Sequence, residues 1–141
     1  MKKILAPFVL IFLLVACSAL SEGTEKGEQY VSKFHKLYNA QDYDAMYRTA
    51  SEEYREVTAK DFHKRLFKTL ERRLGQVTGK TRTGWRVNAG TGGTIINLAY
   101  DTDFALAKGQ ETFVIRLRDG KAELLSYNVN SPALMIELEE N

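Results

Sequence analysis

The feature that most constrains this chain is a change in the spacing of its apolar residues at Gly75. Before Gly75, apolar side chains recur about every 3.6 residues, which places them on one face of a helix. After Gly75 they alternate with polar side chains, as in strands that have one buried face. Helices followed by strands predict an α+β protein, in which N-terminal helices pack on a curved antiparallel sheet of about four strands.

Three helices are expected before Gly75. The first covers about residues 25 to 39, where Tyr30, Phe34, Leu37 and Tyr38 have helical spacing. Asp42 can cap a short second helix that carries Tyr43, Met46 and Tyr47. The third begins at the capping-box spacing from Thr58 to Asp61 and ends at Gly75, since glycine suits a left-handed C-terminal position. Its expected apolar face consists of Phe62, Leu66, Phe67, Leu70 and Leu74.

Four strands are expected after Gly75, at about residues 77–87, 96–104, 113–117 and 125–129. In the second strand the polar alternation predicts that Asp101 and Asp103 face solvent. Asp119-Gly120 supplies the positive backbone φ angles of a tight hairpin turn. The glycine-rich stretch from Asn88 to Gly93 lacks the Walker spacing of a phosphate-binding loop and is expected to be a hairpin loop.

The first seventeen residues have the organisation of a secretion signal. Lys2 and Lys3 precede an apolar run of about 13 residues, and this run ends in Leu14-Val15-Ala16-Cys17. A membrane-spanning helix needs roughly 20 apolar residues, so the run is expected to be removed from the mature protein. Cys17 is the only cysteine, which excludes an intramolecular disulfide and a cysteine-ligated metal site.

This ending resembles the signal of bacterial lipoproteins. The resemblance implies cleavage between Ala16 and Cys17, attachment of acyl chains such as palmitate at Cys17, and a lipid anchor in the bacterial cell envelope. Two or three acyl chains hold a protein on a bilayer far more firmly than one chain. Ser18 resembles the residue that follows the cysteine in lipoproteins of the outer membrane, facing the periplasm, where the host has one. The alternative is an ordinary cleaved signal in which the cysteine has no role.

The predicted organisation is a signal peptide at residues 1–16, a lipidated cysteine with a flexible tether at 17–28, an α+β domain at 29–131 and a tail at 132–141. Without Lys2 and Lys3 the chain is electrically neutral, but residues 60–86 hold nine bases and only two acids. This segment either meets anionic lipid headgroups or is a solvated helix flank paired with acidic neighbours. Nucleic acid is not an expected partner, because bases are common on exposed helix faces and do not by themselves indicate nucleic-acid binding.

The order of the elements over about residues 28–130 resembles the nuclear transport factor 2-like superfamily, a cone-shaped fold shared with ketosteroid isomerase. Three segments are similar to bacterial envelope proteins of the domain of unknown function 4019 group: Asn39 to Ala45, Leu74 to Val77, and Asp119 to Tyr127. Ala122 stands where that group commonly has a tryptophan. The resemblance implies a cone with an internal pocket, and it implies no particular reaction.

In such a cone, four aromatic residues are candidates for lining a pocket that orients a small apolar ligand: Tyr38, Tyr47, Trp85 and Tyr100. The alternative is that they fill the core or its rim. An isomerase or hydratase would need a carboxylate or a histidine inside the cavity, opposite a hydrogen-bond donor. His35 and His63 are instead expected at the surface or its boundary, without the spacing of a metal site.

We therefore expect no catalytic residue, metal or cofactor, and favour a noncatalytic envelope protein that binds a small apolar ligand or a protein partner at the membrane surface. The alternative is a cone-fold enzyme, isomerase-like or hydratase-like, that uses a buried carboxylate. A buried ionisable residue with a convergent donor would favour this alternative. The apolar segment from Ala133 to Ile136 either covers an exposed sheet face in a homodimer or packs onto its own domain.

Overall fold

The computed structural model describes the backbone of residues 6–135 and the side chains of residues 21–135. The described part begins with the helices α1 (Ala6–Asn39), α2 (Tyr43–Thr49), α3 (Glu52–Val57) and α4 (Lys60–Leu74). The strands β1 (Val77–Gly90), β2 (Gly93–Phe104), β3 (Lys108–Arg118) and β4 (Lys121–Asn130) follow, and a short 3₁₀ turn, η1 (Pro132–Leu134), comes last. The predicted fold class, helices followed by a curved four-stranded antiparallel sheet, is confirmed.

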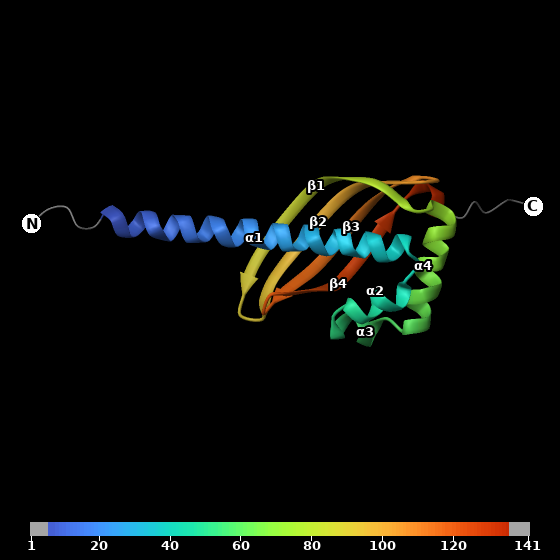
Figure 1. Ribbon diagram of the computed structural model, residues 1–141, viewed down its shortest axis with the longest axis horizontal. Coiled ribbons are helices and arrows are strands. Elements are labelled where there is room, and N and C mark those ends of the chain that lie inside the picture. The colour runs from blue at the N-terminus through green and yellow to red at the C-terminus, as the bar shows by residue number, and fades with distance from the viewer. Residues whose placement is uncertain (1–5, 136–141) are drawn as a thin grey trace, which may run out of the picture.

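The strands form one sheet in the order β1-β2-β3-β4, and each neighbouring pair is antiparallel. The helices lie on one face of this sheet: α1 runs along the sheet and α4 crosses one of its ends (Figure 1). We call the covered face the inner face and the opposite face the outer face. The core lies between the inner face and the helices, where the ring of Phe34 packs edge-on against those of Phe67 and Phe113.

The segment predicted to be a flexible tether, residues 17–28, is helical throughout and belongs to α1, so that prediction is wrong. Gly23 and Gly27 are buried against the sheet. A Cβ atom at Gly27 would lie 2.9 Å from Cγ2 of Ile96, and one at Gly23 would lie 3.2 Å from Cγ1 of Val87. The absence of side chains at these glycines therefore allows α1 to lie close to the sheet. Packing of the domain begins near Gly23.

The connection between α1 and α4 contains two capped short helices. The Asp42 carboxylate accepts a hydrogen bond from the Ala45 backbone N–H at 3.0 Å, which confirms the predicted cap of α2. Helix α3 was not predicted; its cap is Ser51, whose hydroxyl oxygen accepts from the Tyr54 backbone N–H at 3.1 Å. The Ser51 backbone N–H also donates to the Leu124 carbonyl at 2.9 Å, which ties this connection to β4.

Helix α4 ends as predicted and begins differently. Gly75 has a φ of 79° at its C-terminal end. The predicted capping box is wrong, because Ala59 is the N-terminal cap and no side chain accepts a hydrogen bond there. Phe67, Leu70 and Leu74 are buried as predicted, but the first turn differs: His63 is 1% exposed, whereas Phe62, which was expected in the core, is 53% exposed.

Both predicted hairpins are present. β1 and β2 are joined within the glycine-rich stretch as predicted, but the turn is only Thr91-Gly92, because Gly90 pairs with Gly93 and the residues before Gly90 belong to β1. Asp119 and Gly120 have φ angles of 52° and 74° in the turn between β3 and β4. No helix within the described residues is long and apolar enough to cross a membrane.

Candidate functional site

Two of the four predicted pocket-lining aromatics, Tyr38 and Tyr100, lie in the core, each 2% exposed. The Tyr38 hydroxyl donates to the Gly75 carbonyl at 3.0 Å, and its ring packs against Phe67 and Phe104. Burial raises the pKa of Tyr100 to about 12. The placement of both residues corresponds to the core-filling alternative.

The other two predicted residues lie apart from these. The Tyr47 hydroxyl donates to the Thr58 carbonyl at 2.9 Å, and this bond ties α2 to the loop before α4. Trp85 is 54% exposed on the edge strand β1 and belongs to a shallow hollow of about 370 Å³. Neither Tyr38, Tyr47 nor Tyr100 lines that hollow, so the described structure does not gather the four aromatics around one opening.

A buried polar cluster occupies the inner face of the sheet instead, and its centre is Glu111 on β3, only 1% exposed. The carboxylate accepts hydrogen bonds from the Thr102 hydroxyl at 2.6 Å and from the Tyr127 hydroxyl at 2.7 Å. His35 Nε2 lies 2.8 Å from its Oε2 atom. The prediction that His35 lies at the surface is wrong, since this histidine is 5% exposed.

The protonation of this cluster follows from its partners. Burial raises the pKa of Glu111, but the hydrogen bond and charge of His35, with the hydroxyls of Thr102 and Tyr127, outweigh burial and hold that pKa below its ordinary value. Glu111 is therefore a carboxylate at neutral pH, and because a carboxylate only accepts, His35 Nε2–H must donate. His35 Nδ1 is buried without a hydrogen-bond partner among the described residues.

The Glu111 cluster is closed to ligands in this conformation. Both carboxylate oxygens are engaged by protein donors, and neither Glu111 nor His35 lines the hollows of about 590, 440 and 370 Å³ on the described residues. A general base needs a free lone pair within reach of a substrate proton. In this arrangement the buried Glu111 carboxylate joins α1, β2, β3 and β4 through hydrogen bonds, and a protein donor occupies each of its oxygens.

The second histidine, His63, is also buried, so its predicted surface position is wrong. Its Nε2 atom lies 3.1 Å from the Tyr43 carbonyl, and its Nδ1 atom lies 2.9 Å from the Tyr54 hydroxyl. The carbonyl only accepts, so Nε2–H donates to it and neutral Nδ1 accepts from Tyr54. Burial lowers the pKa of His63, which favours this neutral form, although the bond to Tyr43 works against the shift.

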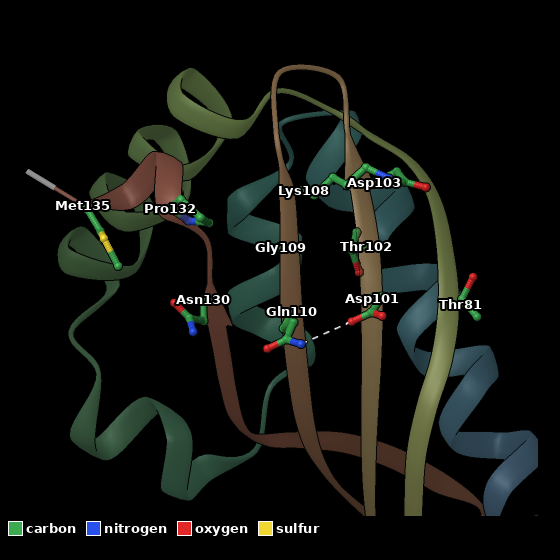
Figure 2. A pocket seen from close by; sticks show the side chains of 10 residues that line it. All are labelled: Thr81, Asp101, Thr102, Asp103, Lys108, Gly109, Gln110, Asn130, Pro132 and Met135. Carbon is green, nitrogen blue, oxygen red and sulfur yellow. Dashed lines mark hydrogen bonds and ion pairs between the residues drawn. The ribbon is translucent and has the colours of Figure 1, made fainter.

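The outer face of the sheet carries a hollow that is lined mainly by polar side chains. This polar groove has a volume of about 590 Å³. One row of paired residues crosses all four strands within it: Thr81 faces Asp101, Asp101 faces Gln110, and Gln110 faces Asn130. Figure 2 shows these four side chains side by side across the strands. The other residues of the groove are Thr102, Asp103, Lys108, Gly109, Pro132 and Met135.

Charge is unevenly matched inside the polar groove. Asp103 is paired with Lys108 at 3.1 Å. Asp101 has no cationic partner among the described residues, and its neighbour is the Gln110 amide, whose Nε2 donates to it over a long 3.5 Å (Figure 2). The groove therefore presents amide, hydroxyl and carboxylate groups that are largely free to bind something else.

The turn after β4 forms the wall of the polar groove. The Ser131 hydroxyl donates to the Lys108 carbonyl at 2.6 Å and accepts from the Ala133 backbone N–H at 3.3 Å, which fixes the start of η1. Pro132 and Met135 then form an apolar end beside β4, and Met135 is 70% exposed. Leu134, from the segment considered for a homodimer, packs partly against the core of its own domain, and Ile136 lies outside the described residues.

Sequence reasoning placed Asp101 and Asp103 on the solvent face, where they are, but missed the polar groove, whose wall comes from the distant turn at η1. The predicted lipidation site, Ala16 and Cys17, lies in the helical backbone of α1, and its side chains are outside the described ones. Among the described residues, no three histidine, cysteine, aspartate or glutamate side chains are grouped as metal ligands.

The chain matches no known family model, and no curated protein matches it at a significant level.

Proposed function

We propose that this protein is a lipid-anchored protein of the bacterial cell envelope whose domain binds a small ligand without catalysis, at the polar groove. The observation that carries the proposal is the row of Thr81, Asp101, Gln110 and Asn130, which are held by four different strands and open to solvent. Strands fix the spacing of such groups, so the groove is organised before a ligand arrives.

The groove indicates a polar ligand rather than the wholly apolar one expected from the aromatic residues. Amide and carboxylate groups bind hydroxyl and amide groups, and the uncompensated charge of Asp101 favours donors on the ligand. Pro132 and Met135 add an apolar contact at one end. The preferred ligand therefore bears several hydrogen-bond donors and one apolar portion, which a short peptide of a protein partner also satisfies.

The anchor is supported by the residues before and at Cys17 and by the geometry of α1. Packing on the sheet begins at Gly23, so only residues 17–22 would separate an acylated Cys17 from the domain. Six helical residues span about 9 Å. The domain would then be held close to the bilayer surface, and in bacteria with two membranes we place it on the periplasmic side of the outer one.

The cone-fold enzyme remains the alternative, and Glu111 is the buried carboxylate that it would use. The position of Glu111 favours the enzyme, because three donors, from Thr102, Tyr127 and His35, converge on this one carboxylate. The contacts of the Glu111 carboxylate argue against the enzyme, since all of these donors already bind the group that would have to act as a base. We therefore assign Glu111 to stability and the polar groove to binding.

The groove is tested with two asparagines on the same strand. Asn130 belongs to the polar groove, whereas Asn128, two residues earlier and also exposed, does not. The full chain would be purified in detergent from its host, and native mass spectrometry would measure the small molecule that it retains. We expect Asn130→Ala combined with Gln110→Ala to abolish retention, and Asn128→Ala to leave it intact. Retention that survives the double variant would place the binding site elsewhere.

The anchor is tested separately at Cys17. Cys17→Ala should move the protein from the detergent-extracted membrane fraction to the soluble or unprocessed pool, because the acyl chains have no attachment point. The mass of the Cys17 peptide from the wild-type protein reports acylation directly. An unmodified Cys17, or a variant that is still processed and membrane-bound, would contradict the anchor without affecting the test of the groove.

A further inference from the structure

Helix α4 presents a continuous row of bases to solvent. Lys64, Lys68 and Arg72 follow one another at intervals of four residues, and Arg65 lies beside them; all four are exposed. We call these four residues the α4 basic face. Side chains four residues apart on a helix are neighbours, and like charges at this spacing destabilise the helix. Repulsion between these bases therefore lowers the stability of α4, and a bound anion would reduce this repulsion.

The described structure supplies little internal compensation for this charge. Lys64 lies 3.9 Å from Asp44, which Lys60 approaches more closely at 3.2 Å. The side chains of Arg65, Lys68 and Arg72 have no ion pair or hydrogen bond with any described residue. Helix α4 holds two acids, Asp61 in its first turn and Glu71, and neither forms an ion pair with these bases.

Several bases on the sheet are ion-paired. Arg82 pairs with Glu28 at 2.8 Å, Lys108 with Asp103 at 3.1 Å, and Arg116 with Glu123 at 3.3 Å. Arg82 therefore belongs to the packing of β1 on α1, although it lies within the basic segment 60–86 of the sequence. Lys80 and Arg86, the other bases of β1 in that segment, have no ion pair with a described residue, but they are single charges on a strand, whereas the bases of α4 are adjacent on one helix.

Two exposed apolar side chains lie at the N-terminal end of α4. Val57, the last residue of α3, is 85% exposed, and Phe62 in the first turn of α4 is 53% exposed. A soluble anion is bound by charge alone, whereas a bilayer surface also accepts apolar side chains between its headgroups. Bases together with exposed apolar residues therefore favour a lipid surface as the occupant of this face.

We propose that the α4 basic face, with Val57 and Phe62, docks on a bilayer surface that contains anionic phospholipid headgroups. This proposal rests on the proposed anchor for its biological setting, because a polybasic surface adds a second membrane contact to acyl chains. In Figure 1, α4 crosses the end of the sheet farthest from the N-terminal part of α1. Contact at both places requires α1 to lie along the bilayer rather than to stand upright on it.

The test measures which lysines a bilayer covers. The full chain would be reconstituted into vesicles of phosphatidylcholine alone, or of phosphatidylcholine with about one-third phosphatidylglycerol, and treated with an amine-reactive reagent. Mass spectrometry then reports the reactivity of each lysine. We expect the reactivity of Lys64 and Lys68 to fall several-fold only in the anionic vesicles and to recover in about 1 M salt, where the screening length is about 3 Å. Lys108, on the outer face of the sheet, should react equally in both.

Matched variants sharpen the result. Lys68→Gln with Arg72→Gln removes two charges from α4, and Arg86→Gln with Arg118→Gln removes two charges from the sheet; all four side chains are exposed, so both variants should fold. Because each base near a membrane surface contributes about a fivefold change in partition, the first variant should lose most of the protection at Lys64 and the second none.

Equal Lys64 reactivity in both kinds of vesicle would overturn the proposal. Equal protection by inorganic phosphate added to neutral vesicles would also overturn it, since the site would then bind free anions rather than a bilayer. The mass of the Cys17 peptide is recorded in the same experiment, so a failed anchor is distinguished from a failed α4 contact.

Discussion

The two faces of the sheet use the same kinds of polar residue in opposite ways. On the inner face, the side chains of Thr102 and Glu111 are 1% exposed, and each hydrogen-bonds to a partner within the protein. On the outer face, Asp101 and Gln110, their immediate neighbours in sequence, are exposed and joined only by a 3.5 Å hydrogen bond. Alternation along a strand thus separates groups that stabilise the fold from groups that are available to a ligand.

This difference shows that burial alone does not identify a site. A buried carboxylate with a lowered pKa is a reasonable sign of chemistry, but Glu111 has a partner for each oxygen. The exposed Asp101 lacks a cationic partner among the described residues. For ligand recognition, the hydrogen-bonding capacity that a polar group has left unused matters more than how deeply the group is buried.

The largest expected effect follows from removing the inner carboxylate. Glu111→Ala leaves His35, Thr102 and Tyr127 without their shared acceptor and should lower the free energy of unfolding by about 3–5 kcal/mol. Glu111→Gln keeps the size of the side chain and should cost less. Chemical denaturation would measure both.

The matched control for Glu111 is its outward-facing neighbour. Gln110→Ala should change the free energy of unfolding by no more than about 0.5 kcal/mol, since Gln110 is exposed. Similar losses for Glu111→Ala and Gln110→Ala would show that the two faces do not differ as the contacts indicate.

A smaller effect is expected where α1 meets the inner face. Gly27→Val places a branched side chain where even a Cβ atom would lie 2.9 Å from Ile96 and 3.0 Å from Leu98, so stability should fall by about 1–3 kcal/mol. Gly92→Val, in the β1–β2 hairpin, has nothing within 4 Å of its Cβ position and should change stability little. A harmless Gly27→Val would restore the flexible tether that the composition of residues 17–28 predicted.

Features set by neighbouring residues were predictable from the sequence. Gly75, the Asp42 cap and the Asp119-Gly120 turn each depend on a few adjacent positions, and the structure has all three. Gly23 and Gly27 were misinterpreted, because glycine also suits flexible segments. Their spacing of four residues on one helix face was the available sign of a close helix–sheet contact.

The buried polar residues were missed although their spacing carried a signal. Glu111 continues the alternation of Phe113 and Ile115, so its position in the strand was inward. His63 lies on the same helix face as Phe67 and Leu70, whereas Phe62 does not. In both cases the polar residue type suggests solvent, whereas the position in the pattern indicates the core. The polar groove carried no comparable signal, because it depends on the placement of η1 beside strands far away in the sequence.

The last and smallest effect is the response of stability to pH, which comes from the inner side of the molecule. Burial lowers the pKa of His63 from its ordinary value of 6.5. Just below pH 6.5, His63 is therefore protonated in the unfolded chain but still neutral in the folded protein. The contribution of His63 is therefore complete above pH 6.5 and is lost as the pH falls toward its folded value. One group changes the free energy of unfolding by at most about 1.4 kcal/mol per pH unit.

Glu111 adds a second loss at lower pH, because its folded pKa lies below the ordinary value of 4.5 and its contribution disappears as the pH falls through that folded value. The difference in the free energy of unfolding between pH 7 and pH 5.5 reports His63, because the loss from Glu111 begins only near pH 4.5 and below. His63→Gln, whose amide can still accept from Tyr54, should flatten the change between these pH values. An unchanged slope in His63→Gln would mean that His63 is not the group that titrates there, and its neutral, doubly bonded state in the core would then be wrong.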